Sequence, residues 1–262
     1  MDLKLKDKVA IIGGSSKGLG KACATSLAKE GVNFVLCARN EEELDKTKKK
    51  IEGFGVEVLA LSVDMSKEGD NERIVKETIE KFGRIDILVN NSGGPSPGSF
   101  DDISMDDFDE AYNSVLKYNI RMIKLCLPYM EKKGWGRIIN IASMTVKEPS
   151  PTMVLSNVFR TAVISFAKSI SKELIGKGIT INNVCPGYFR TDRINQLMEK
   201  EAGDANVSVQ EYEQEVMSSL PHRRFMNPSE LGNMVAYLCS SQARAITGTT
   251  VQIDGGVNSG LF

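Results

Sequence analysis

The sequence predicts an α/β fold: a single Rossmann-type, doubly wound domain with a seven-stranded, mostly parallel sheet and helices on both faces. Three observations support this prediction. Short apolar, β-branched runs alternate with amphipathic helical stretches along the chain. Most of these runs are apolar throughout, as in parallel strands buried on both faces. A glycine-rich loop follows the first run. We expect one domain over residues 1–262.

The predicted elements alternate along the chain. Strands are predicted at residues 8–14, 33–39, 56–64, 85–93, 136–143, 178–187 and 249–256. The glycine loop opens the first helix, and later helices are predicted at 41–52, 68–82, 104–132, 152–176 and 228–240. The second helix places Glu42 and Lys46 four residues apart, and the third carries an apolar stripe. This order requires right-handed crossovers between parallel strands.

Two segments interrupt this alternation. Residues 95–102, PSPGSFDD, read as a Pro/Gly/Ser-rich loop inside the pattern and not as a domain boundary. Residues 190–227 form a long segment with few strong patterns, and we expect it to be irregular. Because this segment follows the carboxyl end of a predicted strand, we interpret it as a substrate lid and not as a linker.

The charge balance argues against two classes of partner. The chain has 33 basic and 34 acidic residues, a formal net charge of −1. Nothing in this balance favours nucleic acid or an anionic membrane surface. No apolar stretch approaches the roughly 18 residues that a membrane helix needs, and no signal peptide is visible. We therefore expect a cytoplasmic protein that binds no membrane.

The number and spacing of the cysteines and histidines do not predict a metal site. The five cysteines lie apart, in apolar surroundings and without CxxC spacing, so we expect reduced thiols in the core. The one histidine, His222, is too few for a His-rich metal site, and a Ser-His-Asp triad would have to use it. No metal is therefore predicted.

The glycine loop, GGSSKGLG at 13–20, indicates a nucleotide site. Gly14, Gly18 and Gly20 have the spacing GxxxGxG between the first strand and the first helix. Glycine lets the backbone approach a pyrophosphate, and the helix N-terminus offers free N–H groups. A Walker A loop is excluded, because Leu19 stands where that motif has Lys.

After the glycine loop the chain carries Asp64, NNSG at 90–93, PGYFRT at 186–191 and IDGG at 253–256, in that order. With these motifs the chain resembles the short-chain dehydrogenase/reductase family over nearly its whole length. The glycine loop is similar to TGxxxGxG, with Gly13 in place of Thr; NNSG at 90–93 is similar to NNAG; Asp64 matches the adenine-contacting Asp; PGYFRT at 186–191 matches PGxxxT; and IDGG at 253–256 matches the closing strand. The resemblance implies that the cofactor is bound by Gly14, Ser16, Lys17, Gly18, Leu19, Gly20, Arg39, Asn40, Asp64, Met65, Asn91, Gly93, Arg160, Pro186, Gly187, Phe189 and Thr191.

The choice of cofactor is argued from charge. Enzymes that use NAD place an acid at the end of the second strand, where it binds the ribose. Here that position is Ala38, followed by Arg39, and Lys17 lies in the glycine loop. Both cations suit a 2′-phosphate, so the sequence favours NADP(H) over NAD(H). The alternative is that both are ordinary surface cations.

The resemblance breaks at the catalytic residues. In the family a Ser, a Tyr and a Lys carry the reaction, helped by an Asn. Ser143 matches the Ser, but Ser156 stands in the Tyr place and Arg160 in the Lys place. Val115 stands in the Asn place, and Asn119, one turn on, either substitutes in part or is an ordinary polar residue.

The proton donor is therefore open. A Ser hydroxyl is a much weaker acid than a Tyr phenol, whose pKa is about 10. Arg160 keeps the positive charge but cannot shuttle a proton. Lys147 could serve as general acid, or could form a solvated pair with Glu148. Tyr188 is a second candidate, Tyr112 and Tyr118 are more remote ones, and His222 is expected to be structural.

Three hypotheses of function follow. The first is an NADP(H)-dependent oxidoreductase that interconverts a small-molecule carbonyl and an alcohol, with Ser143, Ser156, Arg160 and Lys147 as catalytic residues. The second is a catalytically impaired, nucleotide-binding homologue that acts as a sensor or structural subunit. The third is a lyase or isomerase that binds the nucleotide structurally, which no residue positively supports. The resemblance also implies a homo-tetramer or homo-dimer, formed through the helices at 104–132 and 152–176.

Overall fold

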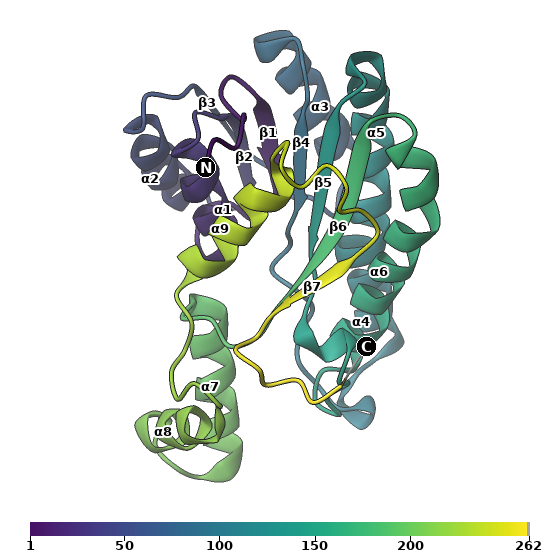
Figure 1. The fold of residues 1–262 in the computed structure, drawn as a ribbon. Helices are drawn as coiled ribbons and strands as arrows, with labels where there is room; N and C mark the ends of the chain where they lie inside the picture. The colour runs from purple at the N-terminus through teal and green to yellow at the C-terminus, as the bar shows by residue number, and fades with distance from the viewer. Residues whose placement is uncertain (261–262) are drawn as a thin grey trace.

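A seven-stranded, wholly parallel sheet forms the centre of the molecule, as the sequence predicts (Figure 1). The computed structural model describes residues 1–260, so residues 261 and 262 of the predicted domain lie outside the described part. The strands are β1 Val9–Ile12, β2 Asn33–Ala38, β3 Val58–Ser62, β4 Ile87–Asn90, β5 Gly136–Ile141, β6 Ile179–Pro186 and β7 Thr250–Ile253. Their order in the sheet is β3-β2-β1-β4-β5-β6-β7. The order reverses direction between β1 and β4, where a doubly wound sheet binds its ligand.

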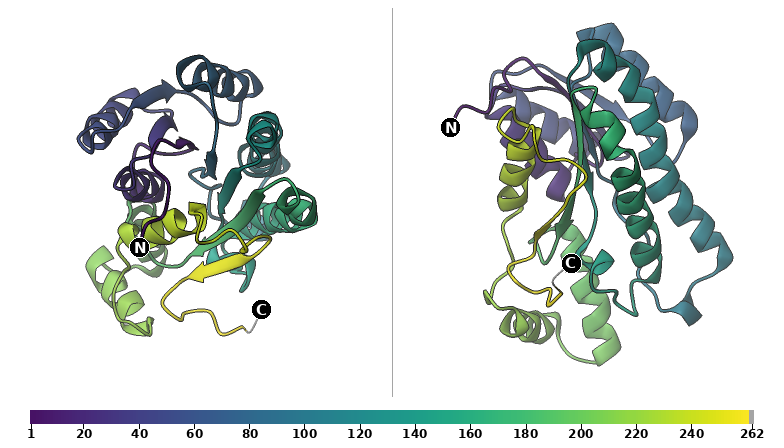
Figure 2. Two further views of the ribbon diagram at one scale, coloured as in Figure 1. Left: turned by 45° about the horizontal axis from the view of Figure 1, so that its top comes forward. Right: turned by 45° about the vertical axis from the view of Figure 1, so that its right-hand side comes forward.

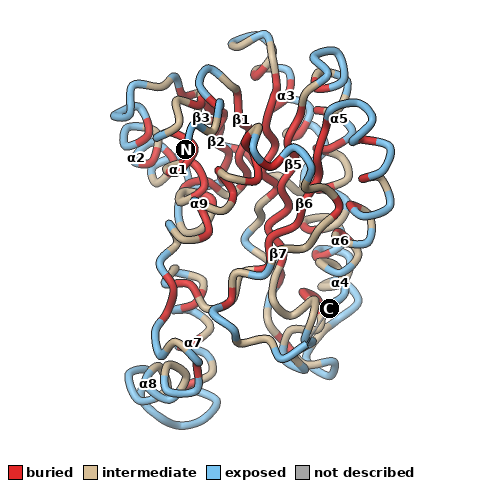
Figure 3. The backbone as a smooth tube through the Cα atoms, viewed as in Figure 1, coloured by how far each residue is buried: buried red, intermediate tan, exposed pale blue. Residues whose placement is uncertain are grey.

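Helices cover both faces of the sheet (Figure 2). The main ones are α1 Gly18–Ala28, α2 Glu41–Glu52, α3 Glu68–Phe82, α5 Tyr118–Lys133, α6 Val154–Ile175 and α9 Pro228–Cys239. Side chains of β1 alternate between the two resulting cores: Ile12 packs with α1, α2 and α9, and Ile11 packs with α3, α5 and α6. Because helices cover both faces of the central strands, β1, β4 and β5 are buried throughout, whereas β3 and β7 at the two edges of the sheet are partly exposed (Figure 3).

The segment at 190–227 is helical, so the expectation of an irregular segment was wrong. It contains α7 Asp192–Ala205 and α8 Val209–Ser219, which lie beyond one end of the sheet (Figure 1). Local capping explains both helices. The Thr191 hydroxyl accepts a hydrogen bond from the Ile194 N–H at 3.4 Å, and Ser208 forms a capping box with Glu211. A small apolar cluster, with Met198 and Phe225 at its centre, holds the two helices together.

The predicted helix at 104–132 is divided into three parts. After α4 Met105–Ala111 the chain makes a π-helical turn, Tyr112–Lys117, before α5 begins. The side-chain amide of Asn119 donates to the Val115 carbonyl at 2.6 Å and so gives that carbonyl, inside the turn, a hydrogen-bond partner. Such turns add one residue to a helix and are frequent at functional sites.

A row of buried amides links the carboxyl ends of the central strands. Asn90 on β4, Asn140 on β5 and Asn183 on β6 stand side by side in register. Asn90 Nδ2 donates to Asn140 Oδ1 at 3.0 Å, and Asn140 Nδ2 donates to Asn183 Oδ1 at 2.9 Å. We call these three residues the amide row. It fixes the relative height of three strands whose following loops carry the candidate site.

Candidate active site

A cavity of about 760 Å³ lies at the carboxyl edge of the sheet. Its walls come from the segments that follow β1 to β6, together with α4, α6 and α7. This size and position are typical of ligand sites in doubly wound folds. The cavity brings together 18 of the predicted residues: Gly14, Ser16, Lys17, Gly18, Leu19, Arg39, Asn40, Asp64, Met65, Asn91, Gly93, Ser143, Ser156, Arg160, Pro186, Gly187, Phe189 and Thr191. Gly20 and Lys147 are not among its lining residues.

The glycine loop fits a pyrophosphate. Gly14 and Gly18 both have φ of +55°, a conformation that other residues adopt only with strain. The N-terminus of α1 has no side-chain cap and no acid in its first turn, so its N–H groups and positive dipole are open to an anion. Asn91 Nδ2 supports the loop from beneath by donating to the carbonyls of Gly13 at 3.0 Å and Gly14 at 3.3 Å.

Gly20 does not line the cavity, and its role is in packing. A Cβ added at this position would overlap the carbonyl oxygen of Gly14 and would lie 2.8 Å from Asn91 Nδ2. The glycine therefore lets the first turn of α1 approach the loop.

Two cations, Lys17 and Arg39, line the cavity beside the glycine loop, and β2 ends without an acid. Ala38 ends the strand, and the exposed Arg39 next to it has no ion pair among residues 1–260. Lys17 forms an ion pair of 3.0 Å with Asp192, the first residue of α7. Both side chains are more than half exposed (57% and 60%), so this pair is weak and leaves Lys17 accessible.

Asp64 keeps one carboxylate oxygen for a ligand. Its Oδ1 accepts from the Ser66 backbone at 3.0 Å and from the Ser66 hydroxyl at 2.7 Å. Burial raises the pKa of Asp64, but the hydrogen bonds from Ser66 and the charges of Arg39 and Lys67 together outweigh this effect, so the net pKa is lowered. Asp64 is therefore an anion at neutral pH.

Ser143 is arranged as a hydrogen-bond donor to the cavity. Its Oγ accepts from the Thr145 N–H at 3.2 Å and from the Thr145 hydroxyl at 3.0 Å. With its oxygen occupied as an acceptor, the Ser143 hydroxyl proton is free to be donated to a ligand oxygen. Ser156 lines the same cavity and is 3% exposed.

Arg160 is anchored at the end of β5. Its Nη1 donates to the carbonyls of Ile141 at 2.5 Å and Ala142 at 2.8 Å, directly before Ser143. Its Nη2 faces the Gly94 loop, where an added Cβ would lie 3.1 Å away. Burial lowers the pKa of Arg160 to about 10, so the side chain remains a cation at neutral pH. The charge expected from the family Lys is thus retained, in a fixed position.

The other proton-donor candidates lie away from the cavity walls. Glu148 accepts from Asn258 and Ser259, and no Lys147–Glu148 ion pair occurs within residues 1–260. Tyr188 packs against Phe225, with ring centroids 6.3 Å apart, in the cluster beneath α7 and α8. Tyr112 is 42% exposed on the π-helical turn.

Two further residues considered from the sequence, Asn119 and Tyr118, make contacts within the fold and do not line the cavity. Asn119 donates its amide to Val115 and does not line the cavity, which corresponds to the ordinary-polar alternative. Tyr118 is fully buried, and burial raises the pKa of its phenol far above the ordinary value. Its hydroxyl oxygen lies 2.5 Å from where a Cβ of Gly13 would be, which explains the glycine at position 13.

Several lining residues were missed at the level of sequence. Arg193 and Leu197 on α7, Met153 and Leu155 at the start of α6, and, on either side of the predicted Gly93, Ser92 and residues 94–96 all border the cavity. Arg193 is the notable one, since its Nη2 donates to the Pro95 carbonyl at 2.8 Å and so joins α7 to the loop after β4. Its position two residues after Thr191, in the predicted cofactor loop, was the available signal.

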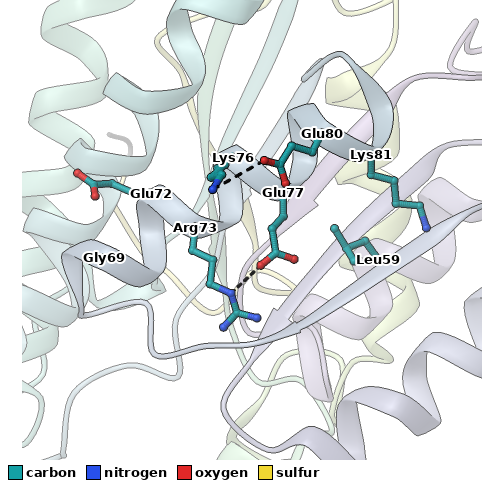
Figure 4. Close-up of a pocket in the computed structure, with 8 residues that line it drawn as sticks. All are labelled: Leu59, Gly69, Glu72, Arg73, Lys76, Glu77, Glu80 and Lys81. Atoms are coloured by element: carbon teal, nitrogen blue, oxygen red, sulfur yellow. Dashed lines mark hydrogen bonds and ion pairs between the residues drawn. The ribbon is translucent and has the colours of Figure 1, made fainter.

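A second concavity lies on the outer face of α3, next to Leu59 (Figure 4). Four of its six charged side chains pair along the helix: Arg73 with Glu77 at 2.7 Å and Lys76 with Glu80 at 3.8 Å. Such i,i+4 pairs are ordinary features of an exposed helix. This surface therefore has no feature of a ligand site.

In residues 1–260, none of the helices combines the length and apolar character that crossing a bilayer requires.

Comparison with known proteins shows the family of this chain. Residues 14–258 match the family model described as Enoyl-(Acyl carrier protein) reductase. The chain is 32% identical over 254 residues to NADPH-dependent reductase BacG of Bacillus subtilis (strain 168), covering 96% of this chain and 98% of the relative. It is 33% identical over 258 residues to Dehydrogenase/reductase SDR family member 4 of Sus scrofa, covering 98% and 89%.

A solved structure extends the comparison from sequence to three dimensions. L-Sorbose reductase from Gluconobacter frateurii, complexed with NADPH and L-sorbose, superposes with a TM-score of 0.94 at 31% identity and covers 100% of both chains. The family model, the curated relatives and this fold coincide over the segments that build the cavity. The chain belongs to the short-chain dehydrogenase/reductase family.

Proposed function

We propose that this protein is an NADP(H)-dependent oxidoreductase that interconverts a carbonyl compound and an alcohol with an altered proton relay. One observation carries the proposal: the glycine loop, Ser143, Ser156 and Arg160 line a single cavity. The oxidoreductase class itself follows from the family. When bound, the nicotinamide cofactor supplies or accepts the hydride.

The residues of this chain would bind the substrate oxygen, stabilise its charge and supply the proton. Ser143 donates its hydroxyl proton in a hydrogen bond to the substrate oxygen, because its lone pairs are occupied by Thr145. Arg160 stabilises negative charge that develops on that oxygen and contributes donors for the cofactor ribose. Ser156 passes a proton from solvent to the oxygen, more slowly than a phenol would. Lys147, which lies off the cavity wall, is the weaker candidate for this step.

The preference for NADP(H) belongs to the same proposal. The β2 end has Ala38 in place of an acid, and Arg39 is exposed without an ion pair in the described chain. A guanidinium suits a phosphate dianion, and Lys17 adds a second charge nearby. The relative from Bacillus subtilis is named an NADPH-dependent reductase. We expect Arg39→Asp to reduce the ratio of NADPH to NADH affinity at least tenfold.

The proposed assembly is a homo-tetramer or homo-dimer. Met105, Tyr112 and Val158 are large apolar side chains, 74%, 42% and 47% exposed, on α4, the π-helical turn and α6. Exposed apolar residues on neighbouring elements favour a contact with another subunit. Sedimentation velocity of the wild type and of Val158→Arg tests this. A monomer at micromolar concentration in the wild type would contradict it.

The second candidate function is a nucleotide-binding subunit without turnover. The replacements at Ser156, Arg160 and Val115 together favour it, because each removes a group that the family uses. In addition, Arg160 commits one nitrogen to two backbone carbonyls. Both functions predict tight cofactor binding, so binding alone does not separate them.

Turnover with a rebuilt motif separates the two candidates. We suggest titrating NADPH and NADP⁺ by fluorescence, then following cofactor absorbance with panels of carbonyls and alcohols at several pH values. The oxidoreductase proposal predicts wild-type turnover that falls at least tenfold in Ser143→Ala. If turnover appears only in the Ser156→Tyr, Arg160→Lys double variant, the native chain has lost the reaction. An Arg244→Gln variant, at an exposed position outside the cavity, controls for loss of charge.

A further inference from the structure

Two arginines from different helices meet at the catalytic end of the cavity. Arg160 comes from α6 and Arg193 from α7, and both line the cavity. Each is held by backbone carbonyls: Arg160 by Ile141 and Ala142, and Arg193 by Pro95 at 2.8 Å. These anchors use one terminal nitrogen of each guanidinium. The remaining N–H groups have no carboxylate partner in the part of the chain that the structure describes.

This arrangement places two cations in one cavity, and neither has a carboxylate within ion-pair distance among residues 1–260. Burial lowers the pKa of both guanidiniums, and the charge of Arg193 lowers the pKa of Arg160 further. Removing a cation from water is costly unless it is paired, and a like-charged neighbour adds to that cost. Two fixed, unpaired guanidiniums that face one cavity are therefore suited to an anion, which each can bind with two parallel hydrogen bonds.

The position of the pair indicates a substrate anion. The pyrophosphate of the cofactor already has the open N-terminus of α1 and the glycine loop. Arg160 instead lies one helical turn after Ser156, and its anchor residues directly precede Ser143. Ser156 also lacks the ring that a Tyr would put beside these groups, so this corner has more room. A group of carboxylate size next to the reacting carbonyl would lie between the hydroxyls and the guanidiniums.

We propose that Arg160 and Arg193 form a carboxylate subsite and that the substrates are 2-oxo acids and the corresponding 2-hydroxy acids. This inference rests on the proposed function. In the reducing direction a hydride from NADPH bonds to the carbonyl carbon, the π electron pair moves to oxygen, and that oxygen takes one proton from water. NADPH is oxidised to NADP⁺, and the acid is reduced to the 2-hydroxy acid.

Binding of an unreactive mimic tests the subsite without any turnover. Oxamate and its neutral analogue oxamide are titrated into the protein–NADPH complex, and NADPH fluorescence reports occupancy. We expect oxamate to bind at least tenfold more tightly than oxamide. Arg193→Gln should weaken oxamate at least tenfold, since a hydrogen bond to a charged group is lost. Arg193→Lys should retain part of the affinity, and Arg244→Gln should retain all of it.

The outcomes distinguish the inference from the proposed function. Equal affinity for oxamate and oxamide would overturn the subsite, even if neutral carbonyls are reduced. If Arg193→Gln weakens NADPH and leaves oxamate unchanged, the pair serves the cofactor phosphates and the inference is wrong. Arg193-dependent binding of oxamate without turnover of pyruvate or of any other carbonyl or alcohol in the panels would support the subsite and refute the oxidoreductase. Faster turnover of pyruvate than of methyl pyruvate, lost in Arg193→Gln, would support both.

Discussion

Replacing Asn140 by Ala in the amide row should destabilise the protein strongly. Asn140 accepts from Asn90 at 3.0 Å and donates to Asn183 at 2.9 Å, and each of the three residues is 1% exposed. The substitution leaves one buried donor and one buried acceptor without partners. Each such group costs about 1–3 kcal/mol, so the free energy of unfolding should fall by about 2–6 kcal/mol. That is a large part of the 5–15 kcal/mol typical of a domain.

The same change should reach the candidate site. The loops that carry Gly93 and Ser143 begin within three residues of the amide row, and the row aligns the strands that hold them. We therefore expect NADPH affinity to fall along with stability. Urea unfolding followed by far-UV circular dichroism measures the first effect, at several protein concentrations because an oligomer unfolds with concentration-dependent stability. NADPH fluorescence measures the second.

The matched control is Asn113→Ala. Asn113 also donates one side-chain hydrogen bond, to the Asp109 carbonyl at 2.8 Å, but on the surface. Its loss should cost no more than about 0.5 kcal/mol. If Asn140→Ala costs less than about 1 kcal/mol, or no more than Asn113→Ala, the energetic role assigned to the amide row is wrong.

Three other predictions concern the site and the core. Gly20→Ala should weaken NADPH binding at least tenfold, because its Cβ would overlap the Gly14 carbonyl. The control is Gly69→Ala on α3, which lies outside the cavity, has no heavy atom within 4 Å of the added Cβ and should bind within about threefold of wild type. Fluorescence titration measures both, and equal losses would contradict the packing argument. Lys147→Met should leave kcat within about twofold, because Lys147 does not line the cavity; a tenfold loss, with normal NADPH affinity, would restore Lys147 as the acid. All five cysteines are buried, and burial raises the pKa of the Cys185 thiol to about 11. A thiol reagent at pH 8 should therefore react with fewer than one thiol per native protein and with all five in urea. The reactivity of Cys185 should rise with pH up to about 11, and fast labelling at pH 8 would refute the buried placement of this thiol.

Much of the fold, and most of the residues that line the candidate site, were predictable from sequence because both depend on local chemistry. Uninterrupted apolar runs identified the strands, and chain order placed their following loops at one edge. Arg39, Asn91 and Thr191 were assigned from motifs in those loops, and all three line the cavity. The two helices of the 190–227 segment were also encoded locally, in the caps at Thr191 and Ser208, although their weak apolar pattern concealed them.

The sequence alone determined the sheet, the glycine loop and the replacements at Ser156 and Arg160. Only the tertiary structure decided which side chains meet. Lys147 follows Ser143 by four residues yet lies off the cavity, while Arg193, from a helix more than thirty residues after Arg160, lines it. Tyr118 likewise explains Gly13 from over one hundred residues away. Periodicity and spacing fix the direction of a side chain within its own element, but its neighbours depend on how separate elements pack, and that information is not local to any motif.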